Sequence, residues 1–188
     1  MVDDRFDRDR DPKLSKGSQI PSLRRRDLEI YRRNLPHWRL PSAVYFVTWR
    51  LHPDQTEMGW RQAGRLLPCE RSLLRDTLLY FQHERYLLFA YVVMDDHAHA
   101  IVQPFDERWS LSNVIHSWKS YSANVMRREH GREGRVWQDE YFDRVIRNES
   151  DYREKLRYIV DNPRKRWPEL RTPYEWCGVT ASIDEIGR

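Results

Sequence analysis

The sequence predicts an α+β domain built around an antiparallel sheet, and three observations lead to this fold class. Segments rich in β-branched and aromatic residues alternate along the chain with segments that carry an amphipathic helical pattern. Two predicted strands are separated only by Asp95 and Asp96, a connection that suits an antiparallel hairpin. A further helical pattern follows the last predicted strand, so the alternation ends in an additional C-terminal helix.

The predicted elements follow the order β-α-β-β-α-β with a terminal helix. The first helix carries leucines on one stripe, and the second begins in a serine-rich stretch and ends near Gly131. We expect strands at 44–51, 86–94, 97–103 and within 136–146, and helices at 70–84, 110–129 and 149–162. This order resembles a ferredoxin-like or RRM-like antiparallel sheet with helices on one face, to which the last helix is added.

The last helix has the clearest predicted boundaries. Asn148 is suited to cap its first turn, and Glu149 and Asp151 are favourable at the positive end of the helix dipole. Pro163 disfavours a helical conformation at the residue before it. We therefore expect the helix to end at about Asn162.

Composition divides the 188 residues into three parts. Residues 1–30 alternate acidic and basic side chains and are expected to form a flexible arm, 31–167 form the folded domain, and 168–188 form a C-terminal extension. Two cysteines are too few for a disulfide framework, and no apolar run is long enough to span a membrane. We expect a cytoplasmic protein without a membrane partner.

His97 and His99 form the most informative pair in the chain. They lie in a predicted strand, where residues i and i+2 project from the same face, whereas Ala98 points to the opposite face. Two imidazoles side by side on a strand provide half of a divalent-metal site. The alternative interpretation is that both histidines are packing residues.

Tyr158 and Asn162 are candidate partners of the histidines. They are four residues apart on the last helix and so share one face. The Asn162 carbonyl oxygen suits Mg²⁺ or Mn²⁺, and the Tyr158 hydroxyl would stand one turn away, where it could attack a metal-bound phosphate. The alternatives are a core aromatic for Tyr158 and a simple helix stop for Asn162.

The stretch His97-Ala-His99 resembles the His-hydrophobic-His motif of single-tyrosine HUH endonucleases. Further blocks resemble the REP-associated tyrosine transposases of that superfamily and occur in family order. They comprise residues 31–38, 45–51, 116–124, 136–144 and 158–163.

The resemblance implies a metal-dependent enzyme that cleaves and joins single-stranded DNA at palindromic repeat hairpins. It implies Tyr158 as the nucleophile that forms a covalent 5′-phosphotyrosine, and His97, His99 and Asn162 as ligands of Mg²⁺ or Mn²⁺. Monomers and dimers both occur among the relatives, so a homodimer stays open. A hairpin-binding protein that does not cleave is the alternative function, and a barrel hydrolase is excluded by the lack of a βα repeat.

Candidate DNA contacts come from basic, amide and aromatic side chains in or near these blocks. An indole in so aromatic a block is also a candidate core residue, and each cation is also a candidate for solvated surface charge. The candidates are Arg24, Arg25, Arg26, Lys119, Trp137, Gln138 and Arg144. The family usually has a proline and a polar residue before the first histidine, where this chain has Asp95 and Asp96, so we expect a looser turn and an altered metal preference.

Overall fold

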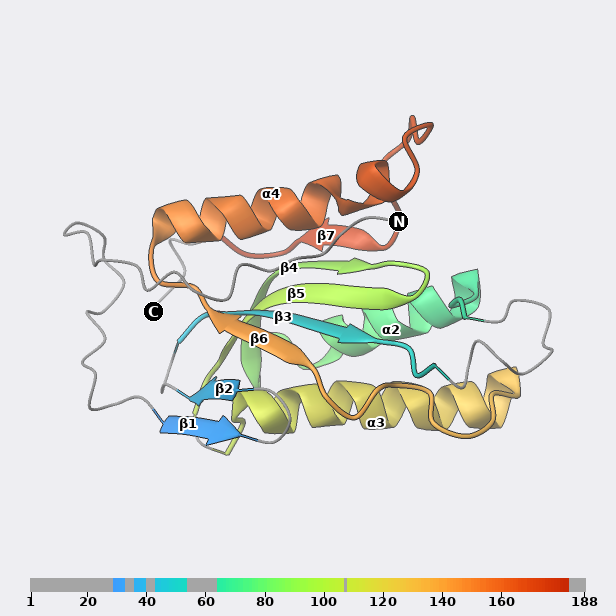
Figure 1. The fold of residues 1–188 in the computed structure, drawn as a ribbon, viewed down its shortest axis with the longest axis horizontal. Coiled ribbons are helices and arrows are strands. Elements are labelled where there is room, and N and C mark those ends of the chain that lie inside the picture. The colour runs from blue at the N-terminus through green and yellow to red at the C-terminus, as the bar shows by residue number, and fades with distance from the viewer. Residues whose placement is uncertain (1–28, 33–35, 40–42, 54–63, 107, 183–188) are drawn as a thin grey trace.

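The computed structural model describes residues 29–32, 36–39, 43–53, 64–106 and 108–182. In this part of the chain, an antiparallel sheet has the strand order β6-β3-β5-β4-β7 (Figure 1), and β1 and β2 form a separate two-stranded sheet. The strands are β1 (Glu29–Arg32), β2 (Pro36–Arg39), β3 (Tyr45–Arg50), β4 (Tyr86–Val93), β5 (His97–Pro104), β6 (Phe142–Val145) and β7 (Cys177–Val179).

Three helices in the described ranges cover the two faces of the large sheet. Helices α2 (Pro68–Tyr80) and α3 (Leu111–His130) pack on one face, and α4 (Glu149–Arg166) packs on the other (Figure 1). None of these helices is both long and apolar enough to cross a membrane. The predicted fold class is confirmed. The strands β6, β3, β5 and β4 lie side by side in the ferredoxin-like order, and helix α4 packs apart from α2 and α3.

The sheet has a core on each side. Val47 and Trp49 of β3 pack toward α2 and α3, whereas Phe46 packs toward α4. Every residue of β4 is buried, which explains its continuous apolar run. Helical layers cover both faces, so alternate residues of β5 face α4 on one side and α2 and α3 on the other.

Helix α3 has the boundaries that its sequence predicts. The Ser110 hydroxyl accepts a hydrogen bond from the Asn113 N–H, and Gly131 ends the helix with φ of 69°, a left-handed conformation that glycine adopts without strain. Helix α2 ends at Tyr80, four residues before the predicted end at Glu84.

The prediction that α4 ends at Asn162 is wrong, because the helix continues through Pro163 to Arg166. Proline has no N–H, so the Ile159 carbonyl loses its helical donor. The Cys177 thiol of the neighbouring β7 lies 3.9 Å from that carbonyl and donates to it. Burial raises the pKa of this thiol to about 11, so it keeps the proton that it donates. Tertiary contact thus compensates for the local cost of the proline.

A buried carboxylate ties the start of α2 to the end of α3. Glu70 is fully buried, and its carboxylate accepts hydrogen bonds from the Leu67 N–H at 2.7 Å and from Arg132 at 2.5 and 2.6 Å. Arg132 also donates to the Arg65 carbonyl at 2.6 Å. The segment before α2 is therefore fixed at the point where it meets the turn between β4 and β5.

We predict that Glu70→Ala lowers the free energy of unfolding by about 3 kcal/mol, because it leaves the largely buried Arg132 without its counter-charge. Urea unfolding measures the change. Glu149→Ala is the control, since it removes an exposed ion pair with Arg153 and should cost about 0.5 kcal/mol or less. Equal losses in the two variants would contradict a special role for Glu70.

Candidate active site

His97 and His99 project from the face of β5 that α4 covers. Their ring centroids are 4.7 Å apart, and Ala98 between them is fully buried on the opposite face. Tyr91–Val93 and β3 flank this part of β5 on both sides. The two imidazoles are therefore held side by side on the middle strand of the sheet.

Helix α4 brings Tyr158 into contact with the histidine pair. The Tyr158 ring lies edge-on to His99 with centroids 5.1 Å apart, and edge-on to Phe46 at 5.8 Å. Phe46 in turn stacks on His99 at 5.4 Å. These three rings pack together, so the tyrosine helix docks directly on the histidine strand.

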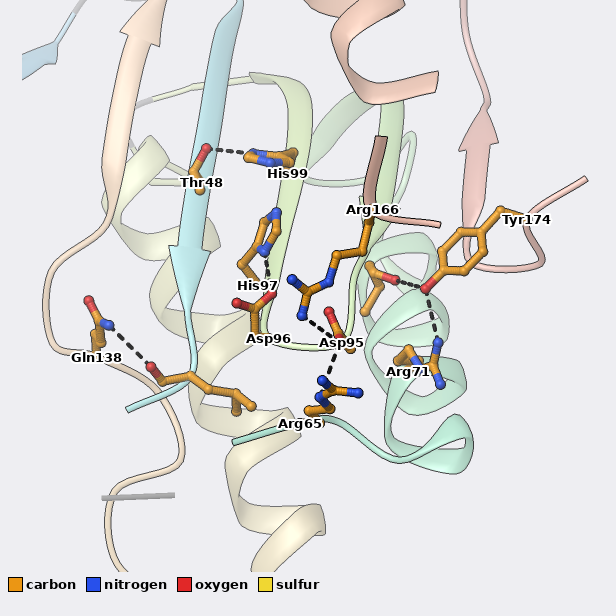
Figure 2. Close-up of polar contacts among 12 residues, drawn as sticks. Thr48, Arg65, Arg71, Asp95, Asp96, His97, His99, Gln138, Arg166 and Tyr174 are labelled. Carbon is orange, nitrogen blue, oxygen red and sulfur yellow. Dashed lines mark hydrogen bonds and ion pairs between the residues drawn. The ribbon is translucent and has the colours of Figure 1, made fainter. Parts of the chain in front are cut away.

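One ring nitrogen of His99 is engaged by a neighbouring side chain, and burial disfavours the charged form of the ring. Its Nδ1 lies 2.7 Å from the Thr48 hydroxyl (Figure 2), while its buried Nε2 has no hydrogen-bond partner among the described residues. Burial, aided by the charges of His97 and Arg50, lowers the pKa of His99 well below its usual value. A neutral ring that donates Nδ1–H to Thr48 keeps its lone pair on Nε2, the atom that a cation would satisfy.

His97 is held by the residue before it. Its Nδ1 is 2.6 Å from the Asp96 carboxylate (Figure 2). Burial raises the pKa of Asp96, but the His97 hydrogen bond and nearby positive charge outweigh that effect and hold the pKa at about 2. The ionised carboxylate fixes the ring through Nδ1, which leaves Nε2 for another partner. In metal sites, carboxylates orient the ligating histidines in this way.

Asn162 lies one helical turn after Tyr158 and is buried. The two residues share the face of α4 that is turned toward the sheet, because their spacing is that of i and i+4. Within the described ranges, no three His, Cys, Asp or Glu residues are grouped as metal ligands. The Asn162 amide carries a neutral oxygen of the kind that Mg²⁺ and Mn²⁺ accept as a ligand.

Asp95 connects the histidine turn to the end of the tyrosine helix. Its buried carboxylate lies 3.1 Å from Arg166 of α4 and 3.5 Å from Arg65 (Figure 2). The Leu66 N–H donates to the Asp95 backbone carbonyl. The looser turn stays a prediction, and the two ion pairs of Asp95 are contacts that a proline at this position would lack.

Two lysines on α4 lie near the aromatic cluster, although the sequence did not place them beside Tyr158. The Lys165 ammonium is 4.9 Å from the centre of the Tyr158 ring, and the Lys155 ammonium is 6.0 Å from that of Phe46. Residues 155, 158, 162 and 165 have the spacing of a single helix face, which is the signal that could have revealed them. Lys165 thus places positive charge beside the tyrosine ring, and Lys155 lies beside its neighbour Phe46.

Three of the predicted DNA contacts lie in or against the 136–141 loop. Lys119 donates to the backbone carbonyls of Gln138 and Asp139, and the Gln138 amide donates to the Leu51 carbonyl. Trp137 is 5% exposed and donates to Ser122 inside the core, which matches the alternative of a core residue, because a buried indole offers no face to a base.

The remaining predicted contacts divide into described and undescribed residues. Arg144 is 45% exposed on the α4 side of the sheet, with its guanidinium 3.4 Å from the Asp151 carboxylate. It is available at the edge of the site. Arg24, Arg25 and Arg26 lie outside the described residues.

A ferredoxin-like sheet that presents paired histidines to a tyrosine on a separate helix matches the class of single-tyrosine HUH enzymes. The comparisons with known proteins agree with this class. The sequence model of the family described as "Transposase IS200 like" matches residues 74–162, which include both histidines, Tyr158 and Asn162.

Two relatives are more specific. The REP-associated tyrosine transposase of Escherichia coli (strain K12) is 27% identical over 105 residues, which are 54% of this chain. The matched part spans 59% of that relative's length. A solved structure of a REP-associated tyrosine transposase bound to a REP hairpin is 25% identical, has a TM-score of 0.54 and covers 73% of each chain. The predicted resemblance to REP-associated tyrosine transposases is confirmed.

We predict that Asp95→Ala loosens the last turn of α4. Losing the contact with Arg166 should speed hydrogen exchange of the backbone amides near residues 164–167 by about fivefold, equivalent to about 1 kcal/mol. The effect is modest because solvent already screens the half-exposed guanidinium. The first turns of α4 should exchange as before. Glu175→Ala, which removes an exposed partner of Arg75, is the control; unchanged exchange near 164–167 in Asp95→Ala would refute the connection.

Proposed function

We propose that this protein is a metal-dependent single-strand DNA endonuclease and strand transferase that acts on palindromic repeat hairpins. The observation that carries the proposal is the contact of the Tyr158 ring with His99, whose buried Nε2 has no hydrogen-bond partner in the part of the chain that the structure describes. The named activity of the relatives, and the hairpin bound to one of them, support the same function.

His97, His99 and Asn162 would hold Mg²⁺ or Mn²⁺. Both histidines have Nδ1 engaged by a neighbouring side chain, so each would offer Nε2, and Asn162 would add a hard oxygen ligand. When bound, the cation would act as a Lewis acid that neutralises charge on the phosphate oxygens. Because only three protein groups would coordinate the cation, further coordination positions would remain for the phosphate and water.

Tyr158 would act as the nucleophile. A phenol with a pKa near ~10 is mostly protonated at neutral pH, so its surroundings must favour the phenolate. The Lys165 ammonium beside the ring supplies favourable charge. The tyrosine oxygen would form a bond to phosphorus while the bond from phosphorus to the 3′-oxygen breaks. The products would be a 5′-phosphotyrosine and, after that oxygen takes up a proton, a free 3′-hydroxyl.

The tyrosine must lie close to the phosphate with little freedom, because catalysis by position depends on near-contact geometry. Three features of this chain restrict α4: the aromatic cluster around His99, the Cys177 contact behind Ile159 and the Arg166 pair with Asp95. Each lies on a different element of the fold. Together they would hold the nucleophile at a fixed distance from the histidines.

Tyr158→Phe should abolish covalent attachment to DNA while leaving DNA binding intact, because it removes one oxygen and keeps the ring. The test incubates the full chain with a single-stranded hairpin oligonucleotide and Mn²⁺ or Mg²⁺, followed by a denaturing gel. A label at the 3′ end should travel with the protein, whereas a 5′ label should leave on a fragment with a 3′-hydroxyl.

Tyr121→Phe is the matched control, because Tyr121 is 57% exposed on α3 at the opposite face of the sheet. It should form the adduct at the wild-type rate. Specific hairpin binding without an adduct under either metal would favour the second interpretation, a protein that binds hairpins without cleaving them.

Metal affinity should depend on Thr48 as well as on the ligands. Thr48→Val removes the hydroxyl that orients His99 and should weaken Mn²⁺ binding by roughly 10- to 100-fold, the loss expected when a metal ligand loses its hydrogen-bond partner. His99→Ala should abolish Mn²⁺ binding. Isothermal titration in the absence of DNA measures both. Thr77→Val, a buried threonine of α2, should bind Mn²⁺ as the wild type does; wild-type affinity in His99→Ala would exclude the proposed site.

A further inference from the structure

The face of the sheet that carries His97 and His99, here called the site face, continues onto strand β6, where Phe142 is more exposed than the residues under α4. Phe142 pairs with Thr48 of β3, and Thr48 pairs with His99 of β5, so the three side chains form one row across the sheet. Directly opposite residues of antiparallel strands project from the same face. Phe142 therefore faces the same side as the histidines, two strand spacings or roughly 10 Å away.

The Phe142 side chain lies at the surface at this position. The residue is 37% exposed, whereas Phe46, on the same face of the neighbouring strand, is buried under α4. A single exposed apolar residue is common on protein surfaces and carries no meaning alone. Its place in the histidine row is what distinguishes it from the other exposed aromatics, such as Tyr80 and Tyr121 on the helices.

Arginines lie on both sides of the Phe142 row. Arg50 follows Thr48 by two residues on β3, pairs with His97 and is exposed. Arg144 follows Phe142 by two residues on β6, pairs with Phe46 and is 45% exposed. Both guanidinium groups therefore start from the site face. An aromatic ring with flanking cations is complementary to a nucleotide, which has a flat base and a charged phosphate.

We propose that Phe142 is a base-stacking residue for single-stranded DNA, and that Arg50 and Arg144 bind the phosphates on either side of the stacked nucleotide. The occupant is the single-stranded segment next to the hairpin, so the inference rests on the proposed function and adds the route of the strand. The stacked base lies about one to two nucleotides from the phosphate at the histidines, given the ~10 Å along the row between Phe142 on β6 and His99 on β5.

Single-stranded DNA fits this surface better than duplex DNA does. Exposed rings on an antiparallel sheet of this topology stack unpaired bases in RNA-recognition domains, whereas the bases of a duplex are already stacked on one another. Stacking also accepts every base, because each has a π face. Phe142 would thus hold the strand at the site, and sequence preference would arise elsewhere.

The experiment compares a hairpin that carries a short single-stranded tail with the same hairpin lacking the tail. Fluorescence anisotropy of the full chain with Tyr158→Phe as background measures binding without cleavage. Adding Phe142→Ala should weaken binding to the tailed hairpin about tenfold, the loss expected for one base–aromatic stack, and leave the blunt hairpin unaffected. Adding Arg144→Ala should reduce the salt dependence of tail binding by about one phosphate contact.

Phe142→Leu guards against a folding defect, because it keeps an apolar side chain of similar reach but lacks the π face. It should lose affinity as Phe142→Ala does, with wild-type thermal stability. Tyr121→Ala, an exposed aromatic on the opposite face, should bind both hairpins normally. A 2-aminopurine in the tail should be quenched on binding to the Tyr158→Phe background protein and much less on binding to either Phe142 variant.

The outcomes separate the two claims. If the wild type forms the covalent adduct but the Phe142 variants bind the tail normally, the stacking role is overturned and the proposed function stands. If the wild type neither binds the tailed hairpin nor forms an adduct, both are overturned. Tail-specific loss in both Phe142 variants, with normal binding by Tyr121→Ala, supports the stacking role.

Discussion

The docking of α4 on the middle of the sheet is the constraint on which the site depends. Phe46, His99 and Tyr158 meet there as three packed rings. Aromatic pairs of this kind contribute only about 0.5–1.5 kcal/mol each beyond the area they bury. The larger share of the docking comes from the apolar core beneath the helix, which includes Tyr152 and Ile159. The same core therefore stabilises the fold and sets the position of the tyrosine.

The two aspartates before His97 each contact a positively charged or titratable side chain of the described fold. Two aspartates stand where related sequences usually have a proline and a polar residue, and both have specific partners: Asp96 holds His97, and Asp95 holds Arg166. One Asp95 oxygen is buried without a hydrogen bond among the described residues, which is a cost to stability. Asp95 thus links the histidine turn to the tyrosine helix.

Much of the fold was predictable because its local signals agree with its tertiary structure. Strand composition, the Ser110 cap and Gly131 each specify an element from within it. The end of α4 was not predictable, since the donor that satisfies the Ile159 carbonyl comes from Cys177 in a strand far along the chain. Trp137 is a similar case, because only packing against Trp49 and Ser122 shows that its ring is buried.

The sequence by itself determined that His97 and His99 share a face and that Tyr158 and Asn162 share another, because strand and helix periods fix those relations locally. The resemblance to REP-associated tyrosine transposases supplied the expected chemistry, in which a tyrosine attacks a phosphate beside a divalent cation. Only the tertiary structure decided that the two faces meet and that Phe142 lies in the histidine row. It also decided that His99 keeps a buried nitrogen with no hydrogen-bond partner from the described ranges of the chain. These facts depend on strand register and helix docking, which arise from contacts between residues distant in the chain.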